Sequence, residues 1–153
     1  MANTYTQIHI QFVFVVQYRK TLIKKEWKDL LYKYITGIIQ NKEHKLLQIN
    51  GMPDHVHILL GMRPYQSISE LAQVVKKQSS DWINEMKFTE RRFNWQPGFG
   101  AFSYSKNDVP RVIRYIANQE QHHRKISFSA EYIKLLEEMK INYDENYLFD
   151  PIL

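Results

Sequence analysis

Two histidines one residue apart, His55 and His57, stand in the otherwise apolar stretch MPDHVHILL. Residues two apart on a β-strand project from the same face, so both imidazoles would lie on one side while Val56, Ile58 and Leu60 face a core. Neutral imidazoles this close together can share a divalent cation. Two separately hydrogen-bonded histidines at a sheet edge are the more common meaning of such a pattern, because two ligands do not define a metal site.

A second group of candidate residues lies further along the chain, in YIANQ. Tyr115 and Gln119 are four residues apart, so on a helix they share one face. That face is offset from the apolar stripe of Val112, Ile113 and Ile116, which puts Tyr115 at the margin of the buried surface, an ordinary place for a tyrosine. The Gln119 oxygen would add a third donor to the two histidine nitrogens. Without cysteine in the chain, an oxygen ligand favours Mg²⁺ or Mn²⁺, although zinc also accepts these donors.

Together these residue types indicate phosphoryl transfer. A metal ion can polarise a phosphodiester and stabilise the charge that builds on its oxygens. A tyrosine oxygen can attack in line and hold the phosphate covalently. Because a phenol has a pKa of about 10, it leaves phosphorus more readily than an alcohol does. The covalent step is therefore reversible, which suits strand transfer better than hydrolysis.

The first half of the chain predicts a strand, a helix and a hairpin. Apolar side chains alternate with polar ones over residues 7–16, as in a strand with one apolar face. Apolar residues recur at helical spacing over residues 27–38. Residues 44–50 and 55–62 read as two strands joined by a turn at 51–54.

The second half predicts helices around two short strands. SISE, Ser67–Glu70, is a capping box that opens a helix. RFNW and AFSYS read as short strands around the turn QPGFG. Asn107 or Asp108 can cap a helix that tolerates Pro110 in its first turn and runs through RVIRYIANQEQHHR. A last amphipathic helix carries Tyr132 and the apolar residues after it.

This order of elements predicts an α+β fold. Strand, helix, strand, strand, helix and strand make a ferredoxin-like split βαβ arrangement with an antiparallel sheet, followed by C-terminal helices that carry Tyr115. We expect a single domain over residues 1–153, which is enough chain for one core. Such a sheet serves many functions, so the fold alone assigns none.

Composition narrows the class of protein. The absence of cysteine excludes disulfides and thiolate metal sites and is consistent with the cytoplasm. The N-terminal segment lacks the features of a signal peptide, and its apolar part is too short to span a membrane, so we expect no membrane association. A net charge of +5 favours polyanionic partners, and the aromatic content of 14% offers rings that could stack on unpaired bases.

Three blocks, MPDHVHILL, WQPGFGAFSYS and VIRYIANQEQHH, occur in an order that is highly specific when taken together. They resemble the small single-tyrosine transposases of the His-hydrophobic-His (HUH) superfamily, which move insertion sequences as single-stranded DNA. The resemblance runs from QYRK to about His123. It implies that His55 and His57 are metal ligands, Tyr115 the nucleophile, and Gln119 the third ligand on the nucleophile's helix.

The resemblance also implies a reaction and an assembly. Members of this family cut next to hairpins at element ends, form a 5′-phosphotyrosine link and rejoin the strands. They act as homodimers, in which the tyrosine helix of one subunit can complete the histidine site of the other. The expected partner is therefore single-stranded DNA with hairpin ends.

Basic and aromatic residues on several elements are candidates for contacts with DNA, although each cluster by itself is most simply a solvated face. These candidates are Arg19, Lys76, Lys77, Trp95, Arg111, Arg114 and His122. Two other functions stay open: an HUH nuclease of the replication-initiator or relaxase type, and a non-catalytic, domesticated hairpin-binding protein. The small size of the chain argues against the first. Tyr115 and Gln119 argue against the second, because a binding protein needs neither in that register.

Overall fold

Four antiparallel strands form the sheet on which the candidate residues lie. The structure is a computed structural model that describes residues 3–144, 146 and 148. The four strands are β1 (His9–Val15), β2 (Lys45–Met52), β3 (His55–Gly61) and β4 (Gly100–Tyr104). They pair in the order β2-β3-β1-β4, and every neighbouring pair is antiparallel. With a helix after β1 and another after β3, this is the predicted ferredoxin-like α+β arrangement.

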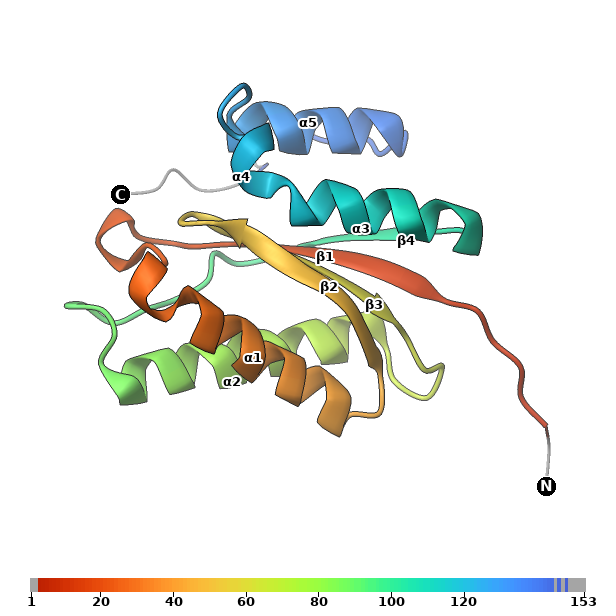
Figure 1. Cartoon of the computed structure of the whole chain (residues 1–153), viewed down its shortest axis with the longest axis horizontal. Helices are drawn as coiled ribbons and strands as arrows, with labels where there is room; N and C mark the ends of the chain where they lie inside the picture. The colour runs from red at the N-terminus through yellow and green to blue at the C-terminus, as the bar shows by residue number, and fades with distance from the viewer. Residues whose placement is uncertain (1–2, 145, 147, 149–153) are drawn as a thin grey trace.

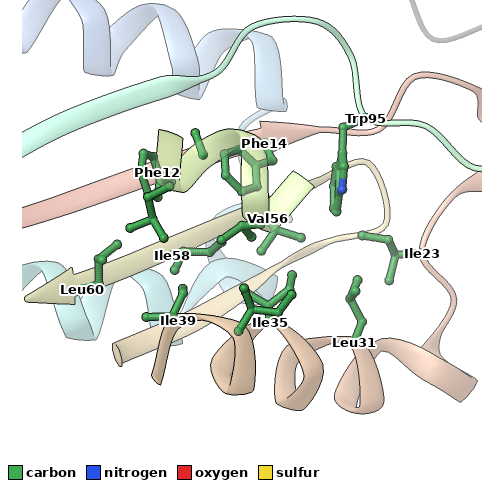
Figure 2. Packing of buried hydrophobic residues seen from close by; sticks show 14 of the residues in the cluster. Phe12, Phe14, Ile23, Leu31, Ile35, Ile39, Val56, Ile58, Leu60 and Trp95 are labelled. Atoms are coloured by element: carbon green, nitrogen blue, oxygen red, sulfur yellow. The ribbon is translucent and has the colours of Figure 1, made fainter. Parts of the chain in front are cut away.

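One face of the sheet is covered by α1 (Lys25–Asn41) and α2 (Ile68–Met86), as Figure 1 shows. The main core lies between these helices and the sheet (Figure 2), and its labelled members include Phe12, Phe14, Leu31, Ile35, Val56, Ile58 and Leu60. The Ser67 hydroxyl accepts a hydrogen bond from the Glu70 N–H at the start of α2, so the predicted cap is present.

The other face is covered by α3 (Val109–Ala117), α4 (Gln119–His122) and α5 (Phe128–Glu138) (Figure 1). Helix α3 packs on β3, where Val112 and Ile116 contact Leu59. Helix α5 closes a smaller core over β1 and β4 that consists of Val13, Phe102, Phe128, Tyr132, Leu135 and Leu136. Two short 3₁₀ turns, Arg19–Thr21 and Lys106–Asp108, follow β1 and precede α3.

Two details of the predicted secondary structure are wrong. The segment RFNW forms no strand; only an isolated bridge joins Trp95 to Val16. Trp95 turns into the core instead, where its indole N–H donates to the Ser79 hydroxyl at 3.0 Å. The helix that carries Tyr115 is also not continuous, because α3 ends at Ala117 and α4 begins after Asn118.

The break at Asn118 has a visible partner in the sheet. The Asn50 side-chain amide donates to the carbonyl oxygens of Ile116 at 3.0 Å and of Ala117 at 3.1 Å. Carbonyl groups in the last turn of a helix lack intrahelical partners and need others. Asn50 thus ties the end of α3 to β2. Among the described residues, no helix has the length and apolar character needed to cross a membrane.

Candidate active site

The two histidines of β3 point away from the main core. Val56, Ile58 and Leu60 belong to that core, so the alternation of the strand places His55 and His57 on the opposite face, as predicted. Both are fully enclosed, with relative exposures of 0% and 1%. Their ring centroids are 5.0 Å apart. The pair is therefore buried beneath the layer of α3, α4 and α5.

Each histidine is held through its Nδ1 atom. Asp54 Oδ1 lies 2.7 Å from Nδ1 of His55, and Gln11 Oε1 lies 2.7 Å from Nδ1 of His57. Because these oxygens accept hydrogen bonds, each Nδ1 carries the donated proton. In the neutral form, each Nε2 then has a free lone pair, which is the arrangement that second partners of metal-binding histidines commonly impose. The Gln11 amide in turn donates to the Tyr104 hydroxyl at 2.7 Å.

A carboxylate that the sequence analysis did not identify, Glu131 of α5, occupies the centre of the site. Its side chain has 2% relative exposure. Oε1 lies 3.0 Å from Nε2 of His57, 3.1 Å from Nε2 of His123 and 3.4 Å from Nε2 of His55. One carboxylate oxygen therefore faces three imidazoles.

The second oxygen of Glu131 faces the candidate nucleophile. The Tyr115 hydroxyl donates a short hydrogen bond to Oε2, and the Gln119 amide donates to the same oxygen at 3.0 Å. His122 Nε2 lies 3.3 Å from it. Although α3 and α4 are separate helices, Tyr115 and Gln119 still converge on one point. Glu131 thus joins the histidine pair to the tyrosine within a single chain.

The pKa values of these groups reflect burial and mutual hydrogen bonding. Burial lowers the pKa of His55, but hydrogen bonds with Asp54 and Glu131 outweigh it and raise the pKa to about 9. Burial dominates at His57 and lowers its pKa. Burial would raise the pKa of Glu131, yet hydrogen bonds with His55 and His57 hold it well below its usual range. Glu131 is therefore a carboxylate.

Tyr115 is a poor nucleophile in this arrangement. Burial, followed by the hydrogen bond and the negative charge of Glu131, raises the pKa of its hydroxyl above the ordinary value of 10.0. A neighbouring anion disfavours the phenolate, whereas a neighbouring cation favours it. Positive charge beside Glu131 would therefore favour the phenolate of Tyr115.

The donor set fits a divalent cation. Ligand atoms of His55, His57 and Glu131 all lie within 4.8 Å of one another, and all three residues are buried. Gln119 Oε1 lies 3.1 Å from His55 Nε2, so an amide oxygen reaches the same place. Imidazole nitrogens with carboxylate and amide oxygens can bind Mn²⁺ or Zn²⁺, and the oxygens suit Mg²⁺. The buried carboxylate also offsets the charge of the ion.

Tyr115 lines two cavities, which it shares with His122. The first, of about 470 Å³, lies between α3 and α5 and includes Arg111 and Lys134 in its wall. The second, of about 710 Å³, includes Arg124 and Lys125. The Tyr115 ring is 6.0 Å from the His57 ring. Cationic side chains therefore line both cavities that Tyr115 borders.

The remaining sequence-predicted DNA contacts are scattered. Arg111 and Arg114 are exposed on α3, and Lys77 is exposed on α2, where it pairs with Asp81 at 2.9 Å. The Lys76 ammonium donates to the carbonyl oxygens of Gln96 at 2.8 Å and Gly98 at 2.6 Å. Trp95, 6% exposed, lies in the core, and Arg19 lines a separate groove. Only Arg111 and His122 of the predicted set line the Tyr115 cavities.

A signal for Glu131 was present in the sequence. Phe128, Tyr132 and Leu135 form the apolar stripe of α5, and Glu131 stands on the same stripe. A lone acid on an apolar helix face needs a buried partner, which here is the histidine pair. The sequence gives less indication that Gln11 is buried, because polar side chains on the polar face of a strand usually contact solvent.

Comparison with known proteins places the chain among transposases. The family model described as "Transposase IS200 like" matches residues 4–119, which includes both histidines, Tyr115 and Gln119. The ISDra2 transposase TnpA of Deinococcus radiodurans is 25% identical over 118 residues, which cover 74% of this chain and 84% of that protein. The transposase for insertion sequence element IS200 of Salmonella typhimurium is 25% identical over 125 residues, which cover 78% of this chain and 81% of the relative.

Solved structures share the fold. The crystal structure of a putative transposase from Deinococcus radiodurans superimposes with a TM-score of 0.62 at 21% identity, over 78% of this chain and 95% of that one. The structure of the REP-associated tyrosine transposase bound to a REP hairpin gives a TM-score of 0.60 at 16% identity, over 80% and 73% of the two chains. Glu131 and α5 lie beyond the residues that the family model matches.

Proposed function

The chain belongs to the IS200-like transposase family, and we propose that it cuts and rejoins single-stranded DNA at hairpin-marked ends with Tyr115 as the nucleophile. One observation carries this proposal. The Tyr115 hydroxyl and the Nε2 atoms of His55 and His57 converge on one buried carboxylate, Glu131, in the same chain. A nucleophile and a metal-binding set are thus within reach of one phosphate group.

His55 and His57 would hold the cation, Mg²⁺ or Mn²⁺, with oxygens from Gln119 and Glu131. When bound, the cation supplies positive charge beside the scissile phosphate. Asp54 and Gln11 keep the two Nε2 atoms aimed at it. The same positive charge opposes the effect of Glu131 on the pKa of Tyr115.

The reaction exchanges one phosphodiester for another. The Tyr115 oxygen loses its proton and attacks phosphorus, so that a tyrosine–phosphate bond forms while the bond from phosphorus to the 3′ oxygen breaks. The 3′ oxygen takes up a proton and leaves as a hydroxyl group. The 5′ end stays attached to Tyr115 until another 3′ hydroxyl attacks it and restores Tyr115. No net energy input is needed, because each step replaces one phosphate ester by another.

Cationic side chains around Tyr115 support a single DNA strand as the substrate. Arg111 and Lys134 line one of the cavities that Tyr115 borders, and Arg124 and Lys125 line the other. A neighbour with the same fold is bound to a REP hairpin, which supports hairpin DNA as the substrate here. We propose a homodimer from the family resemblance. Within this chain the Tyr115 ring lies 6.0 Å from the His57 ring, which supports a site assembled from one subunit of that dimer.

An adduct assay tests the function. The full chain is incubated with Mn²⁺ or Mg²⁺ and hairpin-bearing single-stranded oligonucleotides that carry a 5′ or a 3′ label. A denaturing gel then detects covalent protein–DNA species. We expect an adduct that contains the DNA on the 3′ side of the cut. Tyr115→Phe should form no adduct. The double variant His55→Ala/His57→Ala should also form none but should still bind the hairpin. Tyr143→Phe serves as the matched control, because the Tyr143 hydroxyl donates to Glu137 at 3.2 Å and not to Glu131.

Two results would contradict the proposal. An adduct that persists in Tyr115→Phe would assign the nucleophile to another residue. Tight hairpin binding without any metal-dependent adduct in the unmodified chain would favour the non-catalytic hairpin-binding protein.

A further inference from the structure

A basic groove lies at one end of the sheet, outside the histidine–tyrosine site. It is about 810 Å³ and is bounded by the 3₁₀ turn after β1, the start of α1, the turn between β2 and β3, and the α3–α4 junction. Figure 1 shows the first turns of α1 and the β2–β3 turn at the same end of the sheet, below α4. Ala117 and Glu120 line this groove, whereas Asn118 and Gln121 line the Tyr115 cavity. The groove and the cavity therefore border different residues of the α3–α4 junction.

The groove has a strong excess of positive charge. Five cationic side chains line it: Arg19, Lys20, Lys24, Lys25 and Lys28. The acidic residues in its lining are Glu26 and Glu120, and Glu120 also faces Arg124 at 3.9 Å. Among the ion pairs within the described part of the chain, none involves any of the five cations. Cations gathered in a concave surface without carboxylate partners focus a positive potential that attracts polyanions.

The kind of polyanion follows from what the groove lacks. Sites for single-stranded nucleic acid combine cations with exposed aromatic rings on which bases stack. Of the described residues in the lining, Tyr32 is the one aromatic residue, and it is half-buried. Leu22, Ile23 and Met52 provide an apolar floor instead. Cations without stacking platforms suit a phosphate backbone whose bases are already paired.

We propose that this groove binds the phosphate backbone of the double-stranded stem of the DNA hairpin. The inference rests on the proposed function and assigns the stem a place on the protein. Asn50 connects the two sites, because it lines the groove and also holds the carbonyl oxygens at the end of α3. Tyr115 lies on that helix, so a stem in the groove delivers its adjoining single strand to the nucleophile.

The test measures how DNA binding depends on salt. Fluorescence anisotropy gives the Kd of the full chain for a blunt DNA hairpin without flanks and for an unstructured single strand of equal length, over a range of KCl concentrations without divalent metal. The double variant Lys24→Gln/Lys28→Gln removes two groove cations. Lys33→Gln/Lys45→Gln removes two exposed lysines that do not line the groove and is the charge-matched control.

If both groove lysines contact duplex phosphates, the slope of log K against log salt for the blunt hairpin falls by about 1.8, since each contact contributes about 0.9. Binding of the single strand stays unchanged, and the control variant keeps the wild-type slope with both DNAs. An unchanged slope for the groove variant overturns the proposal. An equal loss in the control, or a loss confined to the single strand, overturns it as well.

The adduct assay separates this inference from the proposed function. The groove variant should need more hairpin-bearing DNA than the wild type to reach half of its maximal adduct, whereas the control variant Lys33→Gln/Lys45→Gln should need the wild-type amount. A wild-type chain that binds the blunt hairpin through the groove but forms no adduct would refute the nuclease function and leave the groove assignment standing.

Discussion

Gln11 Oε1 lies 2.7 Å from Nδ1 of His57, so a residue of β1 sets the proton position on a histidine of β3. The contact is fully buried, and the other end of the Gln11 amide is held by Tyr104 of β4. Three neighbouring strands thus cooperate to aim one imidazole nitrogen. The relationship makes Gln11 a positioning residue for the candidate metal site.

Replacement of Gln11 by Leu should weaken metal binding. Loss of a second partner of a metal-binding histidine typically costs about 10- to 100-fold in metal affinity. Isothermal titration with Mn²⁺ measures the change, with Tyr104→Phe as the control that keeps the Gln11 oxygen in the chain. Equal affinities of Gln11→Leu and the wild type would show that His57 needs no such partner.

Replacement of Glu131 by Gln should destabilise the metal-free chain. The amide keeps the size of the side chain but removes the charge that faces His55 and His57, and breaking a buried charge pair costs about 3–5 kcal/mol. Urea unfolding in EDTA measures the loss. Glu137→Gln, on the exposed side of α5, should change the unfolding free energy by much less. Similar losses in the two variants would argue against a special role for Glu131.

The metal-free chain should lose stability as pH rises through the pKa of His55. That pKa is about 9 in the folded chain, above the ordinary value of 6.5, because Asp54 and Glu131 favour the protonated ring. The stabilisation is fully present below pH 6.5 and disappears as pH passes 9. Thermal unfolding in EDTA between pH 6 and 10 should show a decline that His55→Gln lacks. Parallel curves for the two proteins would contradict the folded-state pKa.

Replacement of Gly51 by Ala should disturb β3 at His55. A Cβ atom at residue 51 would overlap the His55 carbonyl oxygen and approach Val56 Cα to 2.9 Å, so the backbone of the histidine strand must shift. We expect lower stability in urea and weaker Mn²⁺ binding. Gly37→Ala is the matched control: its Cβ meets nothing within 4 Å, and alanine in a helix should stabilise by about 0.5–1 kcal/mol. Equal unfolding midpoints for the two variants would refute the expected clash.

The order of strands and helices was predictable because it depends on local periodicity. The alternation in β1 and β3 and the apolar stripe of α1 each arise within a few residues of one another. The prediction of a strand at RFNW was wrong because a long-range contact, from Trp95 to Ser79, determines the backbone path of this segment. The break at Asn118 has the same kind of cause, since Asn50 approaches from a distant strand.

The candidate site was predictable only in part. His55, His57 and Tyr115 were identified from motifs, and the structure brings these residues together. Glu131 was not identified: its place on the apolar stripe of α5 indicates a buried partner, but only the docking of α5 across the sheet shows that this partner is the histidine pair. Gln11 was not identified for a similar reason. Its partner, His57, lies on a neighbouring strand, and the register that brings the two together is not a local property of the sequence.

The position of α5 matters when one decides whether a gene copy that ends before this helix encodes a functional protein. A reading frame that stopped after α4 would keep all of residues 4–119, which the family model matches, and would still encode both histidines, Tyr115 and Gln119. Its product would lack Glu131, and it would leave Val13 and Phe102 uncovered on the sheet. Exposed apolar side chains of this kind promote aggregation. Such a copy would look intact to a motif search and yet encode a defective protein.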